Sequence, residues 1–153
     1  MIMAQDLDKQ VVVILPIAEG RVLMQLRDLK SGIDAPGCWG FFGGSIAAGE
    51  SPETAAKREL LEEVGFDATF LRWLSSEKIF DLDRIYAHAF ACDLSAPLEE
   101  LNLREGTDFR LVSLEDIVAR KVYSEKLQRY FPTVSTYFIE KTVRKSLALW
   151  SET

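Results

Sequence analysis

The segment from Gly44 to Phe66, GSIAAGESPETAAKRELLEEVGF, constrains this chain more than any other part of it. It contains a glycine, a glutamate six positions later, and then an Arg-Glu pair followed by two more glutamates and Gly65. Seven fixed residues at such spacing would co-occur by chance about once in a billion windows of ordinary composition. The segment therefore specifies both a local structure and a chemistry.

The same segment predicts a helix over 52–64. Ser51 offers a hydroxyl N-cap, and Pro52 suits the first helical position because its missing N–H would be unpaired there in any case. The residues that follow contain no further proline or glycine until Gly65, which is a natural C-terminal stop. We therefore expect a helix with a defined start and a defined end.

Three glutamates of this helix, Glu59, Glu62 and Glu63, stand at i, i+3 and i+4 and fall within an arc of roughly 100°. Like charges at this spacing repel by about 0.2–0.5 kcal/mol per pair. One reading is an ordinary solvated face in which Arg58 pairs with Glu62. The glycine-rich lead-in at 42–44 favours a metal site instead, because a tight turn brings backbone carbonyls close to the carboxylates. Such an all-oxygen ligand set suits Mg²⁺ or Mn²⁺ rather than zinc.

The segment resembles the Nudix box, with every defining position occupied. The resemblance implies that catalytic divalent cations, Mg²⁺ with Mn²⁺ as a substitute, are held by a set drawn from Glu59, Glu62, Glu63, Gly43 and Gly44. It also implies that Arg58 orients the box carboxylates and that Glu50 holds the loop–helix–loop in shape. The preceding residues 39–44 are similar to the family's W-G-x-P-G-G lead-in, with Phe42 in place of the proline.

The resemblance implies an α/β fold, a Nudix-type α/β/α sandwich with a central mixed sheet and a catalytic loop–helix–loop, formed by residues 1–153 as one domain. A hydrophobic content of 48% suits a domain with a core of its own. Apolar runs and alternation predict the strands, which are 11–16, 21–27, 68–80, 85–94 and 109–112. We expect a loop over 28–38 and a turn at 81–84.

From Ser113 onwards the chain is predicted to be mainly helical. Ser113 begins a short helix, because an acid follows it at the capping-box spacing. A longer helical region is expected from Ser124 to about Leu149, with a break near Pro132. Its apolar residues over 130–150 fit either a cover for the sheet or the contact surface of a homodimer.

The reaction implied by the resemblance is metal-assisted attack of water on a phosphorus of a diphosphate linkage, in a nucleoside di- or triphosphate derivative. Family members take the general base either from the box or from a loop beyond it. Glu105 is the preferred candidate in such a loop, and Asp108 is the other. Either residue also fits a solvated turn.

The substrate is expected to be a (d)NTP or a nucleotide sugar, because the ADP-ribose proline is missing and the coenzyme A signature is incomplete. Arg27 is a candidate for binding a phosphate. The candidates for stacking a base are Trp39, Phe41, Phe80 and Tyr86. Each of these aromatic residues also fits a place in the core.

The formal net charge of −6 argues against a nucleic-acid polymer as the main partner. The chain has no apolar run of membrane-spanning length and no secretory pattern, so we expect a cytoplasmic protein without a membrane partner. Two alternatives stay open. One is a Nudix-fold sensor that binds nucleotide without turnover, and the other is an RNA 5′-end pyrophosphohydrolase.

Overall fold

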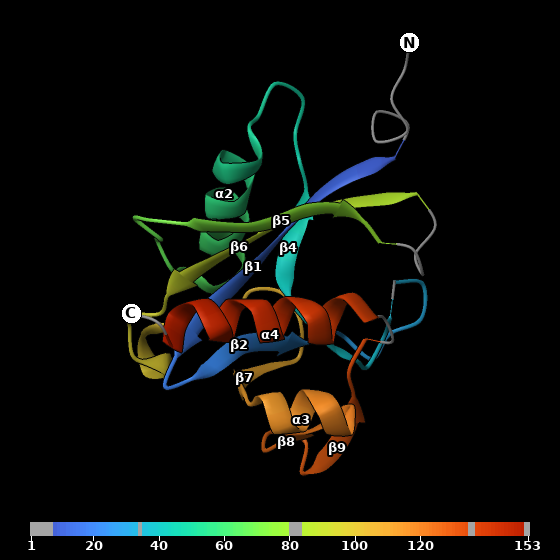
Figure 1. The fold of residues 1–153 in the computed structure, drawn as a ribbon. Helices are drawn as coiled ribbons and strands as arrows, with labels where there is room; N and C mark the ends of the chain where they lie inside the picture. The colour runs from blue at the N-terminus through green and yellow to red at the C-terminus, as the bar shows by residue number, and fades with distance from the viewer. Residues whose placement is uncertain (1–7, 34, 80–83, 135–136, 152–153) are drawn as a thin grey trace.

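The computed structural model describes residues 8–33, 35–79, 84–134 and 137–151 (Figure 1). Its strands are β1 (Lys9–Ala18), β2 (Arg21–Leu26), β3 (Trp39–Gly40), β4 (Phe42–Ser45), β5 (Arg72–Lys78), β6 (Ile85–Asp93), β7 (Asp108–Val112), β8 (Lys121–Ser124) and β9 (Arg129–Pro132). Its helices are α2 (Pro52–Val64), α3 (Leu114–Ala119) and α4 (Tyr137–Ser151), with a 3₁₀ turn at Leu98–Glu100.

The central sheet is mixed, as the resemblance implied. Its strand order is β3-β2-β1-β6-β5, with β4 paired to β1 and β7 paired to β2. The pair β1–β6 is parallel, and every other pair named for this sheet is antiparallel. Strand β1 pairs with β4 over 11–14 but with β2 only at Ile17 and Ala18, so β1 and β2 diverge at the end of the sheet that leads into α2.

Helices cover both faces of this sheet, which gives the α/β/α arrangement of Figure 1. On one face, α2 contributes buried residues to a core with β1, β4 and β6: Ala55, Ala56, Leu60 and Val64. On the other face, α4 contributes Phe138, Ile139 and Val143 to a second core. The predicted alternation in β6 is confirmed, because Ala87, Ala89 and Ala91 belong to the α4 side whereas Phe90 and Cys92 belong to the α2 side.

The local signals for helices α2 and α3 are confirmed. The Ser51 hydroxyl accepts a hydrogen bond from the Thr54 amide at 3.1 Å, and Gly65 ends the helix in the left-handed conformation with φ of 72°. Ser113 and Asp116 form a reciprocal capping box at the start of α3. These ends depend on neighbouring residues, which is why the sequence predicts them well.

The prediction of a helix from Ser124 to Pro132 is wrong. Strands β8 and β9 form a separate two-stranded sheet there, and the helix begins at Tyr137. Tyr123 and Tyr130 lie opposite each other with their rings edge to face, 5.2 Å apart. Aromatic and β-branched residues favour strands and pair across them, and Gln128 turns the chain with φ of 56°.

The predicted strand over 68–80 is shorter than expected, since β5 begins at Arg72. Phe80 and most of the predicted turn at 81–84 lie outside the described residues. No helix in the described part of the chain is long and apolar enough to cross a bilayer.

Candidate active site

Two glycines let the loop between β4 and α2 approach its neighbours closely. Gly43 has φ of 154°, and a Cβ added to it would lie 2.0 Å from the carbonyl oxygen of Val12. A Cβ added to Gly44 would lie 2.5 Å from Oε1 of Glu59. The backbone of this loop is therefore packed directly against strand β1 on one side and a box carboxylate on the other.

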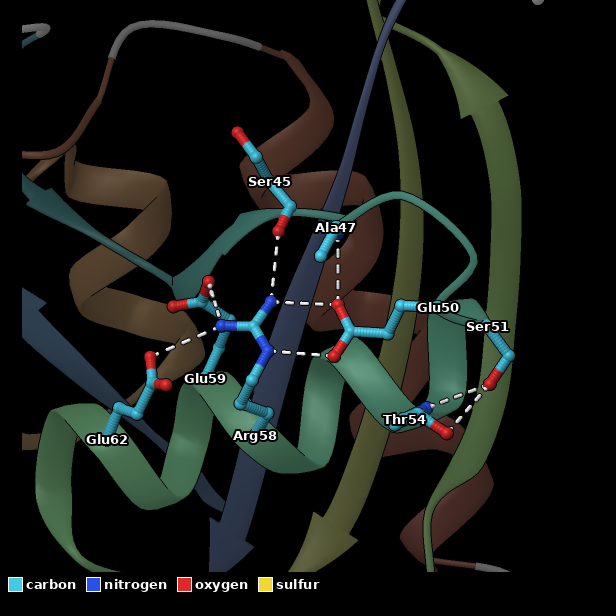
Figure 2. Close-up of polar contacts among 8 residues, drawn as sticks. All are labelled: Ser45, Ala47, Glu50, Ser51, Thr54, Arg58, Glu59 and Glu62. Atoms are coloured by element: carbon cyan, nitrogen blue, oxygen red, sulfur yellow. Dashed lines mark hydrogen bonds and ion pairs between the residues drawn. The ribbon is translucent and has the colours of Figure 1, made fainter.

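Arg58 ties this loop to the helix (Figure 2). Its Nε and Nη2 donate to the two carboxylate oxygens of Glu50 at 2.8 and 2.9 Å, and Nη2 also donates to the carbonyl oxygen of Ser45 at 3.2 Å. Glu50 additionally accepts a hydrogen bond from the Ala47 amide. These donors lower the pKa of Glu50 to about 2, with the Arg58 hydrogen bonds as the largest cause. The predicted orienting roles of both residues fit this geometry.

The same guanidinium holds two of the three box carboxylates. Nη1 of Arg58 donates to Glu59 at 3.0 Å and to Glu62 at 3.2 Å (Figure 2). The Glu62 side chain is 58% exposed, whereas that of Glu59 is 15% exposed. Burial raises the pKa of Glu59, the contacts with Arg58 oppose this, and the charge of Glu62 adds to the increase. Glu62 thus faces Arg58 and solvent.

Glu63 is the buried member of the box, with 3% exposure. Its Oε2 accepts a hydrogen bond from the Gly43 amide at 3.0 Å, and its Oε1 accepts one from the Gln25 side chain at 3.4 Å. Burial raises the pKa of Glu63 to about 8, and the charges of Glu105 and Glu59 add to the increase. A buried carboxylate held by two neutral amides is a strong candidate for binding a cation.

Of the two candidate bases, Glu105 lies near enough to the box for its charge to act on two box glutamates. The charge of Glu105 raises the pKa of both Glu59 and Glu63. Asp108 instead accepts hydrogen bonds from the Ser124 hydroxyl at 2.7 Å and from the Phe109 amide at 2.8 Å. Asp108 is therefore engaged in joining β7 to β8.

The oxygen donors of the box suit a hard divalent cation, but their side chains do not converge on one point. Among the described residues, no three side chains of the metal-binding types converge closely enough to hold an ion. Glu59 and Glu63 lie against the glycine loop, and Glu62 is turned towards Arg58. All donors are oxygens, as a hard divalent cation requires.

Trp39 is a core residue, which corrects its candidacy for stacking a base. Its side chain is fully buried, and its indole Nε1 donates to the carbonyl oxygen of Val122 at 3.1 Å. This bond attaches β3 to the β8–β9 hairpin. An indole with no exposed surface has no face to offer a ligand.

The other predicted substrate residues differ in their surroundings. Phe41 is half-buried on the α4 side, with its ring edge to face against Phe138 at 6.3 Å. Tyr86 is half-buried in β6, and its hydroxyl donates to the carbonyl oxygen of Ser76 at 3.2 Å. Arg27 is half-buried beside Gly40, and Phe80 lies outside the described residues.

Gln25 is a site residue that the motif does not include. It lies in β2 within the apolar run RVLMQL, yet its side chain contacts Glu63 and the backbone of Phe41. The only sequence signal was a polar residue in a buried strand, on the same alternating face as Leu23. That signal marks an inward polar group but does not say what it contacts.

The metal-free protein should become less stable as the pH rises from about 5 to 8. The pKa of Glu63 in the folded protein, about 8, lies above its unfolded value, so the folded state binds more protons in this window. The contribution of Glu63 to the free energy of unfolding is fully present below its pKa in the unfolded chain. It is lost as the pH rises through its pKa in the folded protein. Thermal unfolding in chelator at pH 5.5 and 8.5 measures the slope, and Glu63→Gln should flatten it. An equal slope in both proteins contradicts the prediction.

The structure thus places a mixed sheet between two helical layers, with a glutamate-rich helix that Arg58 ties to a glycine loop. The sequence profile described as NUDIX domain matches residues 7–133. The chain belongs to the Nudix family.

Curated relatives match part of the chain. The oxidized purine nucleoside triphosphate hydrolase of Danio rerio is 36% identical over 88 residues, which cover 56% of this chain and 54% of that protein. The CTP pyrophosphohydrolase of Escherichia coli K12 is 37% identical over 60 residues, which cover 39% and 43% of the two chains. The matches thus span about half the length of these relatives.

Solved structures share the fold over most of the chain. A MutT NUDIX hydrolase from Burkholderia pseudomallei has a TM-score of 0.68 at 18% identity, covering 90% of this chain and 96% of that one. The MutT protein of Methanosarcina mazei Go1 has a TM-score of 0.67 at 20% identity, with coverage of 95% and 96%. The dihydroneopterin triphosphate pyrophosphohydrolase of Escherichia coli has a TM-score of 0.65 at 20% identity, with coverage of 92% and 94%.

Proposed function

We propose that this chain is a divalent-cation-dependent pyrophosphohydrolase that cleaves the diphosphate linkage of a nucleoside triphosphate. The observation that carries the proposal is the buried Glu63 carboxylate, which is held between the Gly43 amide and Gln25 in a complete Nudix box. Family membership supports a need for a divalent cation. Mg²⁺ is the expected ion, with Mn²⁺ as a substitute, because each donor is an oxygen.

Glu59 and Glu63 would hold the cation, with the Gly43 and Gly44 carbonyls as further ligands and Glu62 joining after it leaves Arg58. When bound, the cation neutralises phosphate oxygens and makes a bound water more acidic. Arg58 and Glu50 keep the loop and the helix in register, so the ligands are in place before the substrate arrives.

Glu105 is the proposed general base. It would accept a proton from the attacking water as the water oxygen forms a bond to phosphorus and the bridging P–O bond breaks, with the leaving phosphate taking the electron pair. Its support is the electrostatic contact of Glu105 with Glu59 and Glu63 across the site.

Glu105→Gln is expected to lower kcat by about 100-fold, the range for loss of a general base, with little change in KM. The amide keeps the size of the side chain but does not accept a proton from water. Steady-state kinetics across pH 6–10 measure the effect. The matched control is Glu100→Gln, whose side chain is exposed in the 3₁₀ turn Leu98–Glu100. Turnover at the wild-type rate in Glu105→Gln would show that Glu105 is not the general base and would favour a residue of the box.

The names of the curated relatives favour a triphosphate over a nucleotide sugar, since one acts on oxidized purine nucleoside triphosphates and the other on CTP. We propose that Arg27 contacts a phosphate and that Phe41 or Tyr86 contacts the base. These three side chains are half-buried, so each has some surface left for a ligand.

The test is a hydrolysis screen with Mg²⁺ and with Mn²⁺, in which released phosphate and pyrophosphate are measured. The panel holds ordinary and oxidised (d)NTPs, nucleotide sugars, ADP-ribose, dinucleoside polyphosphates and triphosphorylated RNA. Turnover of nucleoside triphosphates by the wild type supports the proposal. Nucleotide binding without turnover overturns it in favour of a sensor, and turnover of RNA alone overturns it in favour of an RNA 5′-end enzyme.

A further inference from the structure

The geometry assigns Gln25 as a positioning residue that fixes the Glu63 carboxylate and joins it to the loop carrying Glu105. This inference rests on the proposed function, because the purpose of the arrangement is cation binding. No position of the box motif specifies a glutamine in strand β2. The assignment comes from contacts that this one side chain makes with three separate segments.

The position of Gln25 in the sheet leaves its side chain little freedom. It lies in β2 between β3 and β7, paired with Gly40 on one side and Phe109 on the other. The neighbours Met24 and Leu26 point into the core on the α4 side, so Gln25 points to the α2 side. Its side chain is 3% exposed. A buried amide must find its partners within the site.

The amide nitrogen of Gln25 has two acceptors. It lies 3.3 Å from the carbonyl oxygen of Phe41 and 3.4 Å from Oε1 of Glu63. A backbone carbonyl only accepts hydrogen bonds, so the nitrogen must be the atom that faces it. Because the Gly43 amide donates to Oε2, both oxygens of Glu63 are held by donors from different segments. Each oxygen keeps a further lone pair that can bind a cation.

The other side of Gln25 contacts the loop that carries Glu105. A Cβ added to Gly106 would lie 2.8 Å from Oε1 of Gln25, so the loop backbone packs directly on this oxygen. The loop is held there because the Thr107 amide donates to the carbonyl oxygen of Leu26 at 2.8 Å. Glu63 and the residue next to Glu105 thus contact opposite ends of one side-chain amide.

A neutral donor suits this position better than a charged one. An arginine or lysine at position 25 would pair with Glu63 and take the place of the cation. Glutamine satisfies the buried carboxylate without adding charge, so the negative charge is left for the metal. Residues that hold a ligand in this way commonly change metal affinity by about 10- to 100-fold when they are replaced.

The experiment measures Mn²⁺ binding directly, by the electron paramagnetic resonance signal of free Mn²⁺, without any substrate. Gln25→Met keeps the length of the side chain but removes both donors, and its midpoint for Mn²⁺ is expected to rise by about 10-fold. Turnover at a fixed subsaturating metal concentration should fall in parallel, with KM for the nucleotide unchanged. The matched control is Gln10→Met, because the Gln10 side-chain oxygen lies 2.8 Å from Nε2 of His88 and the substitution leaves its backbone unchanged. Its midpoint should equal that of the wild type.

Gly106→Ala tests the same contact from the loop side, because its Cβ would lie 2.8 Å from Oε1 of Gln25. Its φ of 92° and the Leu26 carbonyl oxygen at 3.0 Å add a cost in stability, which thermal unfolding reports separately from Mn²⁺ binding. Alone, Gly106→Ala should also weaken Mn²⁺ binding. In the Gln25→Met background it should have little further effect, because both substitutions disrupt the same contact. Thermal unfolding in chelator shows that each variant is folded. If Gln25→Met does not fold, the inference is tested by comparing the Mn²⁺ midpoint of Gly106→Ala with that of Gln10→Met.

A wild-type midpoint in folded Gln25→Met overturns this inference and leaves the proposed function intact, as do fully additive effects of the two substitutions. Wild-type protein that neither binds Mn²⁺ nor hydrolyses any nucleotide overturns the proposed function instead. A raised midpoint in both single variants, with little further change in the double variant, supports the assignment.

Discussion

Glu63→Gln is expected to lower hydrolysis by about 1,000-fold at saturating Mg²⁺ while the protein stays folded. The amide keeps the shape of the side chain but removes the negative charge that the cation requires, in a site with 3% exposure where water cannot substitute. Phosphate release under steady-state conditions measures the loss. Mn²⁺ binding should be lost in the same variant.

The control for this variant is Glu53→Gln, in the first turn of the same helix. Glu53 is exposed and lies 3.9 Å from Lys57, so its replacement removes one surface ion pair that contributes less than about 1 kcal/mol. Its activity should equal that of the wild type. If Glu63→Gln kept wild-type turnover, the assignment of Glu63 as a metal ligand would be wrong.

Gly43→Ala is expected to lower the free energy of unfolding by about 3 kcal/mol or more, because overpacking and a strained φ act together. The new Cβ would lie 2.0 Å from the Val12 carbonyl oxygen and 3.0 Å from the Val13 Cα, and these backbone atoms belong to the central strand β1. Relief requires β1 and β4 to separate, which also moves the Gly43 amide away from Glu63. Urea unfolding measures the loss.

Gly20→Ala separates the two causes. Gly20 has φ of 69°, but a Cβ added there would meet nothing within 4 Å. Only the cost of a left-handed conformation remains, which is about 1–2 kcal/mol. If both variants lose the same stability, the collision with Val12 has no effect and the tight packing of the glycine loop is refuted.

Features with local causes could be predicted from the sequence. The ends of α2 follow from Ser51, Pro52 and Gly65, and each acts on atoms within one helical turn. The strands β1, β2 and β7 follow from apolar runs whose alternation is a property of the strand itself. The order of strands in the sheet is non-local and was not predicted; only its mixed character was expected, through the family resemblance.

The β8–β9 hairpin shows where local reasoning fails. Lys121 to Pro132 holds polar and aromatic residues in a pattern that a short helix also allows, so periodicity does not separate the two. What decides the structure is distant in sequence. Val122 accepts a hydrogen bond from Trp39, and Ser124 donates one to Asp108. These partners exist only once the central sheet has formed.

The sequence by itself determined the family, the glutamate-rich helix of the box and the identity of the charged groups on it, because spacing along a helix fixes which side chains share a face. Only the tertiary structure decided what each group contacts. It turned Glu62 towards Arg58, buried Glu63 beside Gln25, brought the charge of Glu105 near Glu59 and Glu63, and used Asp108 to hold a hairpin. The physical reason is that hydrogen bonds and desolvation depend on atoms from distant segments, whose approach no local pattern records.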